Sequence, residues 1–344
     1  MKHKKPVSVL LTDTHLKENN QELVIDIFKQ AVQLCHSLKI KTIFHAGDFF
    51  TSRSSQTLQV LITFYDEILK LLSDNDIVMY SISGNHDKTN QDSERSYLDI
   101  FRHRKCIKVI RKEECFEFDG ITVGFLPFFT DSYKDRLKNI KSIAKGINND
   151  VNILITHHAF NGAVNNDGSV VEDSNSTKLV SYWDKVFVGH YHDSNNFENI
   201  YYFGSAYQGN FGERFDDKGF TILFNDGEHD FEPSNFPKYI KVKLEITDDV
   251  DNEIEMYASK GDNVRFIFHG DKTDLHKIDR QKLDEVGIDV KFELNEVNEE
   301  ILKVESGDFS SMSKKNILGY FKEYCQIQEI PKEKMSQGLK YLIK

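Results

Sequence analysis

The stretch IVMYSISGNHD, residues 77–87, decides how this chain folds. It begins with a β-rich run, Ile77–Ser83, and ends with the turn Gly84-Asn85-His86-Asp87. A Gly-Asn turn that follows a strand directly and presents an imidazole and a carboxylate is unusual. In open α/β sheets, ligands bind in the loops beyond the carboxyl ends of the strands. The stretch therefore predicts a β-strand with a functional site at its end.

Four further blocks of Asp and His have the same character, and four of the five blocks follow a predicted strand directly. The further blocks are Asp13-Thr14-His15, Gly47-Asp48, Thr156-His157-His158 and Gly189-His190-Tyr191-His192. Their donors are oxygens and imidazoles without a thiolate, which suits Mn²⁺, Fe or Zn²⁺ in a hydrolytic site and fits poorly with structural zinc. Seven of the side chains in the five blocks fill two four-ligand shells if one carboxylate bridges. The blocks together predict a two-metal phosphoesterase.

Short β-rich runs alternate with longer helical patterns over the first two hundred residues. This alternation predicts an α/β layered fold with a largely parallel inner sheet. Helical spacing of apolar residues predicts helices over residues 23–38 and 56–72. From Ile200 onward the pattern becomes mostly β, which we interpret as a second layer of sheet that closes a sandwich. Besides Ile77–Ser83, the predicted strands of the first part are Val7–Thr12, Thr42–Ala46, Ile121–Leu126, Val151–Thr156 and Val186–Gly189.

A domain boundary is predicted at residues 234–237, because a new β-α-β pattern follows this segment. We therefore divide the chain into residues 1–236, a β-α-β unit over 237–298, and an acidic linker with two helical segments over 299–344. The predicted elements of the second part are the strands Tyr239–Ile246, Val264–His269 and Asp289–Leu294 and the helix Asp274–Val286.

The composition indicates a globular protein with reduced thiols. No stretch approaches the ~20 apolar residues that span a bilayer, and residues 1–6 lack the apolar region of a secretory signal. The four cysteines are scattered without a CxxC pair, so we expect a cytoplasmic protein. The net charge of −11 disfavours phosphate binding, so DNA contacts would need local patches or a partner. The dense basic run at 102–112 is either a solvated surface or such a patch.

The order of the five blocks resembles the calcineurin-like metallophosphoesterases, whose pattern is D-x-H, GD, GNH[DE], H and GHxH. Within that group the chain is most similar to the SbcD-type DNA repair nucleases, and in size to phage recombination nuclease subunits. The narrower resemblance rests on Gly47-Asp48-Phe49-Phe50, on residues 156–162 and on the Y-x-GS…F-x-E…KG block at 202–219. It implies a four-layer α-β-β-α sandwich with a small β-α-β capping domain, which would bind DNA, and a C-terminal helical tail.

The resemblance also implies two divalent metal ions, with Mn²⁺ the expected species. The first ion would be held by Asp13, His15, Asp48 and His192. The second ion would be held by Asp48, Asn85, His157 and His190, so that Asp48 bridges. His158 adjoins His157 and could exchange roles with it, but the order of the family's ligands favours His157.

Other residues are assigned by the same resemblance. His86 would point at the phosphate, and Asp87 would orient an imidazole. Thr51 stands where the family often has His or Asp, so a partner for His86 is missing or supplied elsewhere, and the balance of exonuclease and endonuclease activity stays open. We expect Glu213 and Lys218 to fix the loop around Gly204-Ser205 rather than to touch substrate. The candidate DNA contacts are Arg53, which stands where the family often has a basic residue, and Arg102, Arg104 and Lys105, which come from the basic run and not from the resemblance.

The function that the resemblance implies is that of a DNA exonuclease/endonuclease subunit in recombination or double-strand-break repair. The C-terminal helices would bind an SbcC-type SMC-like ATPase, a homodimer is compatible with the family, and a phage-encoded chain would work in the host cytoplasm. One alternative is a small-molecule or cyclic-nucleotide phosphodiesterase, which would need neither cap nor tail. Another is a non-catalytic scaffold, which the intact donor set disfavours because buried, unpaired carboxylates and imidazoles are costly without a metal.

Overall fold

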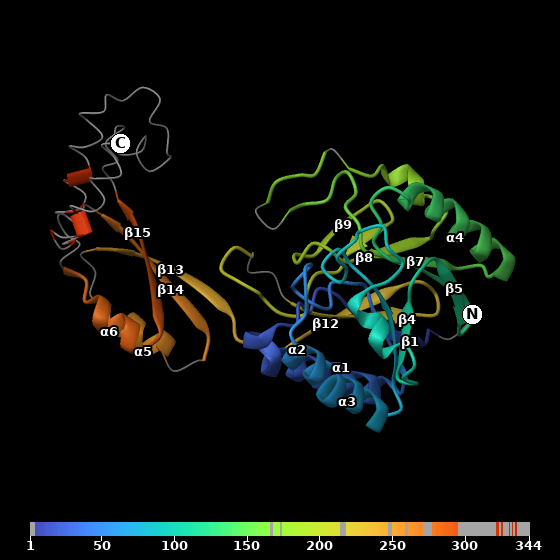
Figure 1. Ribbon diagram of the computed structural model, residues 1–344, viewed down its shortest axis with the longest axis horizontal. Coiled ribbons are helices and arrows are strands. Elements are labelled where there is room, and N and C mark those ends of the chain that lie inside the picture. The colour runs from blue at the N-terminus through green and yellow to red at the C-terminus, as the bar shows by residue number, and fades with distance from the viewer. Residues whose placement is uncertain are drawn as a thin grey trace. The chain divides into compact units, whose positions relative to one another are not determined.

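The computed structural model describes residues 4–165, 168–172, 174–213, 218–246, 250–258, 261–270 and 277–294, with a few isolated positions between 321 and 335. The chain divides into two compact units. One comprises Met1–Lys241 and Tyr257–Val264, and the other comprises Val242–Met256 and Arg265–Lys344 (Figure 1). The predicted division after residues 236 and 298 stays a prediction, and the predicted helical tail lies almost wholly outside the described residues.

Two six-stranded sheets form the described part of the first unit. In spatial order, the first sheet contains His229–Pro233 (β12), Gly219–Phe224 (β11), Pro6–Leu11 (β1), Thr42–His45 (β2), Val78–Ile82 (β3) and Ile107–Ile110 (β4). The second sheet contains Glu114–Phe118 (β5), Ile121–Leu126 (β6), Asn152–Thr156 (β7), Lys185–Val188 (β8), Ile200–Tyr202 (β10) and Asn195–Phe197 (β9). The inner strands β1 to β4 run parallel, as do β6, β7, β8 and β10.

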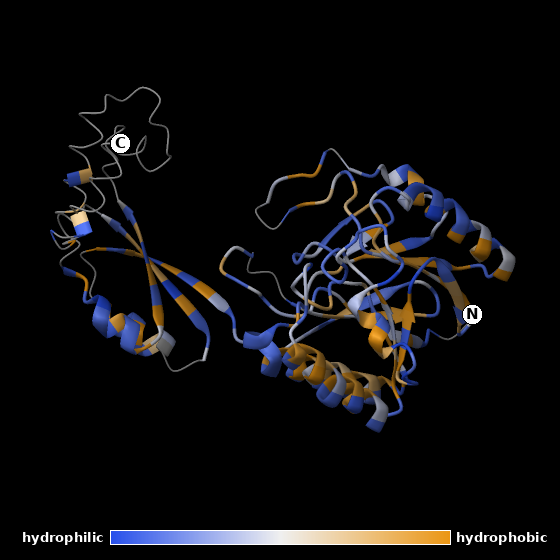
Figure 2. Cartoon of the chain, in the orientation of Figure 1, coloured by the Kyte–Doolittle hydropathy of each residue, from blue (hydrophilic) through white to orange (hydrophobic). Residues whose placement is uncertain are grey.

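Helices cover the outer face of each sheet, which confirms the predicted α-β-β-α layers (Figure 1). Successive residues of β1 point to opposite faces of the sheet, so both faces must be covered. Val9 packs in the core with the first helices, whereas Leu10 packs between the two sheets. Figure 2 shows the mixture of hydrophobic and hydrophilic residues along the helix on the second sheet. The helices of this unit are Gln21–Leu38 (α1), Leu58–Thr63 (α2), Lys70–Asp74 (α3) and Tyr133–Ile147 (α4), with the short 3-10 segments Glu18–Asn20, Tyr97–Phe101 and Thr177–Val180.

The expectation that the strands after residue 200 form a second layer is wrong. β10 joins the second sheet, whereas β11 and β12 extend the first sheet through the antiparallel pairing of β11 with β1. The period-two pattern reports which residues face a core, and it does not report which sheet edge a strand joins. The hairpin of β5 and β6 was also not predicted. Its turn has positive φ at Asp119 and at Gly120, as a two-residue hairpin loop requires.

The helix predicted over residues 56–72 is interrupted by a π-helical turn, Phe64–Leu69, between α2 and α3. The residues that face the core, Val60, Phe64, Ile68 and Leu72, are each four positions apart. A regular α-helix advances 3.6 residues per turn, so this spacing would drift off one face; the wider π turn keeps it aligned. Leu58 and Ile62, two of the apolar residues in the predicted helix, lie before this turn and are exposed.

The last described strands form a three-stranded sheet with the order β13-β14-β15. They are Tyr239–Glu245 (β13), Asn263–Gly270 (β14) and Ile288–Leu294 (β15), with the helices Asp251–Ala258 (α5) and Arg280–Glu285 (α6) between them. The described part of the predicted helix at 274–286 is α6, which is shorter, and α5 overlaps the acidic stretch 247–255, whose sequence leaves a loop or a helix open. Within the described residues, no helix is both long enough and apolar enough to span a membrane.

Candidate metal centre

The loops beyond the carboxyl ends of five parallel strands bring the five predicted blocks together. β1 leads to Asp13 and His15, β2 to Asp48, and β3 to the turn at residues 84–87. From the second sheet, β7 leads to His157, and β8 leads to the block at residues 189–192. Because the inner strands of each sheet run parallel, their carboxyl ends meet at one edge. The side chains therefore come from both sheets.

Four residues of these blocks have a left-handed backbone. The φ angles are 51° at Asp13, 43° at His15, 53° at Asp48 and 95° at His190. Side chains beyond glycine rarely adopt such angles, which cost ~1–3 kcal/mol each and concentrate at functional sites. The neighbouring Gly47, with φ of 98°, has no room for a side chain, because an added Cβ would lie 2.7 Å from an imidazole nitrogen. The backbone of these loops thus accepts a local conformational cost that directs the carboxylate and imidazole side chains into the site.

One group of donors consists of Asp13, His15 and His192, whose ligand atoms lie within 4.8 Å of one another. The Nε2 atoms of the two histidines are 3.1 Å apart, and Asp13 Oδ1 is 3.7 Å from His15 Nε2. Asp13 Oδ2 accepts hydrogen bonds from Thr12 Oγ1 and from the amide of His190. Its other oxygen, Oδ1, is buried without a hydrogen-bond partner among the described residues. This orphaned oxygen faces the two imidazole nitrogens.

A second group consists of Asp48, His157 and His190. Asp48 Oδ2 is 3.3 Å from His157 Nε2 and 3.8 Å from His15 Nε2, so it borders both groups. Asn85 belongs here as well, because its Oδ1 is 3.2 Å from His157 Nε2 and 3.0 Å from His190 Nδ1. His157 Nδ1 donates to the carbonyl of Ala46, which leaves its Nε2 facing the group. The structure therefore gathers all seven predicted ligands in two adjoining groups.

The electrostatics of the site follow from packing imidazoles around buried carboxylates. Burial lowers the pKa of His157, but the Asp48 carboxylate outweighs burial and the pKa rises to about 9. Burial and the nearby His157 lower the pKa of His190 to about 4. Burial alone would raise the pKa of Asp48, yet His157 and His15 hold it well below its usual range. In the metal-free protein, one imidazole thus carries a proton where a cation would bind.

The donor set fits two divalent cations. A buried carboxylate oxygen without a partner and imidazole nitrogens that face each other across about 3 Å both leave lone pairs to be satisfied. Oxygen and nitrogen donors of this kind suit Mn²⁺, Zn²⁺ or Fe. Asp48 Oδ2 stands where a bridging carboxylate would be required. These observations agree with the predicted chemistry of the five blocks.

His86 lies at the exposed side of these groups, and its hydrogen-bond partner is supplied by the backbone of Thr51 and not by a side chain at that position. Its Nδ1 donates to the backbone carbonyl of Thr51 at 2.5 Å, so the side chain at position 51 is not required. Its Nε2 accepts a hydrogen bond from Arg53 Nη2 at 3.1 Å. His86 Nε2 also lies 4.0 Å from Asp48 Oδ2, and His15, Asp48 and His86 form a third group whose ligand atoms lie within 4.8 Å of one another. Of the residues assigned to DNA, Arg53 thus lies at the site.

The structure also bears on two further predicted residues, Asp87, whose role needs correction, and His158. The Asp87 carboxylate is fully buried and accepts hydrogen bonds from the amides of Phe50 and Gly84, so it fastens two site loops together and does not orient an imidazole. The reason is local, since the loop after β2 presents its amides to this carboxylate. His158 points away from both metal groups and stacks on Phe128 with ring centroids 4.6 Å apart. His157 is therefore the histidine of this pair that the structure places among the candidate ligands.

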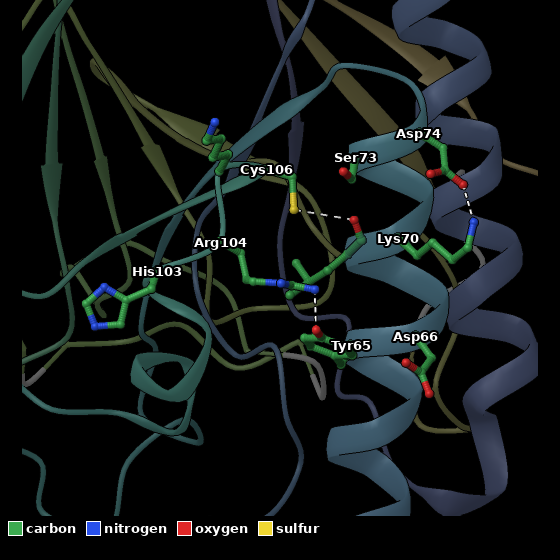
Figure 3. Close-up of a pocket in the computed structure, with 10 residues that line it drawn as sticks. Tyr65, Asp66, Lys70, Ser73, Asp74, His103, Arg104 and Cys106 are labelled. Carbon is green, nitrogen blue, oxygen red and sulfur yellow. Dashed lines mark hydrogen bonds and ion pairs between the residues drawn. The ribbon is translucent and has the colours of Figure 1, made fainter.

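Arg102, Arg104 and Lys105 lie elsewhere. They precede β4, which runs parallel to β3, so they sit at the end of the sheet opposite the metal groups. Arg104 stacks on the ring of Tyr65 and donates to its hydroxyl. Together with Lys105 it lines a separate open cavity of about 480 Å³ beside α3 (Figure 3). The structure does not bring these three residues to the candidate site, and their contact with DNA stays a prediction.

Sequence reasoning missed one contact at the site. Glu213, which we expected only to fix a nearby loop, lies with Oε1 2.9 Å from His192 Nδ1. Asp193 is also buried beside it and was not identified. The position of Asp193 directly after the GHYH block was the only signal, and such a residue is as often a surface aspartate.

Comparison with known proteins agrees with this geometry. A family model described as calcineurin-like phosphoesterase matches residues 8–194, which is more than half of the chain. The chain belongs to the calcineurin-like phosphoesterase family. The matched residues contain every predicted metal ligand.

Three relatives show how this phosphoesterase compares with individual proteins. It is 26% identical over 215 residues to Exonuclease subunit 1 of Enterobacteria phage T4, covering 61% of this chain and 61% of the relative. It is 25% identical over 250 residues to Putative phosphoesterase 244L of Invertebrate iridescent virus 6, covering 69% and 82%. It is 29% identical over 168 residues to DNA double-strand break repair protein Mre11 of Saccharolobus solfataricus, covering 46% and 42%. The similarity thus spans less than two thirds of Exonuclease subunit 1 and of the repair protein Mre11.

Proposed function

We propose that this phosphoesterase is a DNA nuclease that hydrolyses phosphodiester bonds with two divalent cations, with Mn²⁺ as the working ion. The observation that carries the proposal is the position of Asp48 Oδ2 between two donor groups, 3.8 Å from His15 Nε2 and 3.3 Å from His157 Nε2. A shared carboxylate of this kind is what two ions ~3.5–4 Å apart require. Asp13, His15 and His192 would complete the first set of ligands, and Asn85, His157 and His190 the second.

Two cations at this site would supply Lewis acidity that neutralises charge on a phosphodiester and favours loss of a proton from water. The protein's own groups then position the substrate. Arg53 presents a guanidinium at the open side, where it can bind a phosphate oxygen through two hydrogen bonds. A phosphate that binds Arg53 frees the Nε2 lone pair of His86, which can then take up a proton from solvent and donate it to the leaving oxygen. The bond from Nδ1 to the Thr51 carbonyl holds the ring in place for this transfer.

DNA is the proposed substrate because two of the three relatives are named as an exonuclease subunit and as a DNA double-strand break repair protein. The net charge of −11 means that Arg53 and the cations must attract the phosphates. We further propose that the chain works as a subunit in recombination or repair with an SMC-like ATPase, which would bind residues 299–344. Co-purification of the full chain with such an ATPase is the test of that partnership. A chain that elutes alone from an equimolar mixture would refute it.

The central test compares Asp48→Asn with the wild type in Mn²⁺-dependent cleavage of linear duplex DNA, single-stranded DNA and bis-p-nitrophenyl phosphate. We expect the variant to lose activity on all three and to lose both ions in native mass spectrometry. Asp76→Asn is the matched control, because Asp76 has the same φ of 53° as Asp48 but lies exposed at the end of α3. A variant at position 48 with two ions and normal turnover would refute the bridging role. Wild-type cleavage of the small diester without DNA cleavage would favour a small-molecule phosphodiesterase.

A further inference from the structure

A buried network of charges lies behind His192, on the side away from the metal groups. Glu213 Oε1 is 2.9 Å from His192 Nδ1, and Glu213 Oε2 is 3.1 Å from Lys218 Nζ. Lys218 Nζ also donates to Asp193 Oδ1 at 2.9 Å and to the backbone carbonyl of His192. The side chains of Glu213 and Asp193 are 1% exposed, and that of Lys218 is 2% exposed. Three charged groups are therefore removed from water around one imidazole.

Such burial is expensive unless every charge is matched. Removing an ion from water costs several kcal/mol, which a neighbouring opposite charge recovers only in good geometry. Within this network two carboxylates face one ammonium, so the network itself has a net negative charge. The imidazole of His192 lies between that charge and the orphaned Oδ1 of Asp13. The net negative charge of this arrangement therefore favours a cation on the Nε2 side of His192.

The other imidazoles of the site are held differently. His157 donates its Nδ1 proton to a neutral backbone carbonyl, that of Ala46. His15 Nδ1 is buried without a hydrogen-bond partner among the described residues. Only His192 is thus seen to use a carboxylate in this role within the described site. A carboxylate that accepts the proton of a ligating histidine fixes the ring and raises the basicity of its other nitrogen.

The carboxylate of Glu213 is itself held in position. Besides Lys218, the amide of Gly209 donates to Oε1 at 3.0 Å. Residue 209 must approach this closely, since an added Cβ would lie 2.9 Å from Oε1. The loop that carries Glu213 is therefore built around the carboxylate and is not merely covered by it.

We propose that Glu213 is a positioning residue for the first metal ion, held by Lys218 and Asp193 so that His192 Nε2 faces Asp13 and His15. The inference rests on the proposed two-metal function. It adds an asymmetry between the two ions. Loss of Glu213 weakens binding of the ion at the first group and leaves binding of the ion at the second group unchanged.

The test measures Mn²⁺ binding to the full chain by calorimetry and by electron paramagnetic resonance, alongside cleavage. Glu213→Ala should lower the affinity for one of the two ions by about 10–100-fold, which is the range seen when the hydrogen-bond partner of a ligating histidine is removed. Glu213→Gln keeps an acceptor oxygen of the same shape, and should weaken the same ion by less. Nitrogen-detected NMR of the imidazoles should show the His192 ring losing its fixed Nδ1–H form in the alanine variant. Glu113→Ala is the matched control, because Glu113 is also largely buried and paired, with Arg136 at 2.7 Å.

The outcomes separate the two proposals. A wild type that binds two ions, together with an alanine variant that binds both as tightly, would overturn the role of Glu213 and leave the function standing. Equal weakening of both ions in Glu213→Gln with an unchanged melting temperature would show a general structural role and overturn the asymmetry. A wild type that binds no ion at this site would overturn both proposals.

Discussion

Protons should compete with the second metal ion for His157, and the resulting loss of metal affinity can be calculated from the pKa of this residue. The pKa of His157 is about 9 in the metal-free protein, because the Asp48 carboxylate at 3.3 Å outweighs the effect of burial. A metal ion needs the neutral ring, so binding must release this proton at neutral pH. At pH 7, two units below the pKa, the proton should lower the affinity for the ion by about 100-fold, or ~2.7 kcal/mol.

The pH dependence follows in sign and in range. Affinity for this ion should rise about tenfold per pH unit up to pH 9 and then level off, because the ring is neutral above its pKa. His190, with a pKa of about 4, is already neutral and should add nothing in this range. The raised pKa of His157 stabilises the metal-free fold below pH 6.5, and this stabilisation is lost as the pH rises through 9. The metal-free protein is thus favoured where the ion binds most weakly.

Calorimetry in two buffers of different ionisation enthalpy measures the protons released on Mn²⁺ binding. The variant His157→Gln should release about one proton fewer than the wild type at pH 7.5. His36→Gln is the control, because His36 is an exposed imidazole bonded to Asn75 and should leave the proton count unchanged. An affinity that stays constant between pH 7 and 9, or an unchanged proton count in the His157 variant, would refute the reasoning.

Three further predictions address other parts of the molecule. His86→Ala should retain both ions in native mass spectrometry while cleavage falls by about 10²–10⁴-fold, and loss of an ion would instead make His86 a ligand. Phe64→Ala should lower the free energy of unfolding in urea by about 3–5 kcal/mol, since three phenylalanine rings pack around this fully buried side chain at centroid distances of 4.5–5.7 Å. Burial raises the pKa of the Cys35 and Cys115 thiols to about 12, so both should resist alkylation at pH 8 and react only on denaturation or toward pH 12. Rapid labelling of either thiol in the native protein at pH 8 would contradict the last prediction.

The sequence was sufficient to locate the site because its donors stand at strand ends. Parallel strands bring their carboxyl ends to one edge, so Asp13, Asp48 and Asn85, which follow strands of the first sheet, could be placed together from their strands alone. The choice of His157 over His158 had no basis in spacing, and the structure makes it through the stacking of His158 on Phe128. Tertiary partners explain the error at Asp87, whose neighbours are backbone amides that no side-chain pattern reveals.

The fold was predictable to the level of layers and not to the level of strand order. Local alternation identified β11, but its pairing with β1 joins residues more than two hundred positions apart. Periodicity could not reveal the π turn at Phe64–Leu69 either, because a wider turn changes the spacing that the helical pattern assumes. The network around Glu213 likewise depends on a buried lysine that composition would place at the surface.

Because the donors come from both sheets, hydrolytic competence is tied to the completion of the fold. Asp13, His15 and Asp48 follow strands of the first sheet, whereas His157 and His192 follow strands of the second. A chain still emerging from the ribosome holds no complete set of ligands until the second sheet has docked on the first. A partly synthesised or partly unfolded copy would therefore lack the complete site. Each bound ion would also link the two sheets, so that metal binding would add to the stability that the core between them provides.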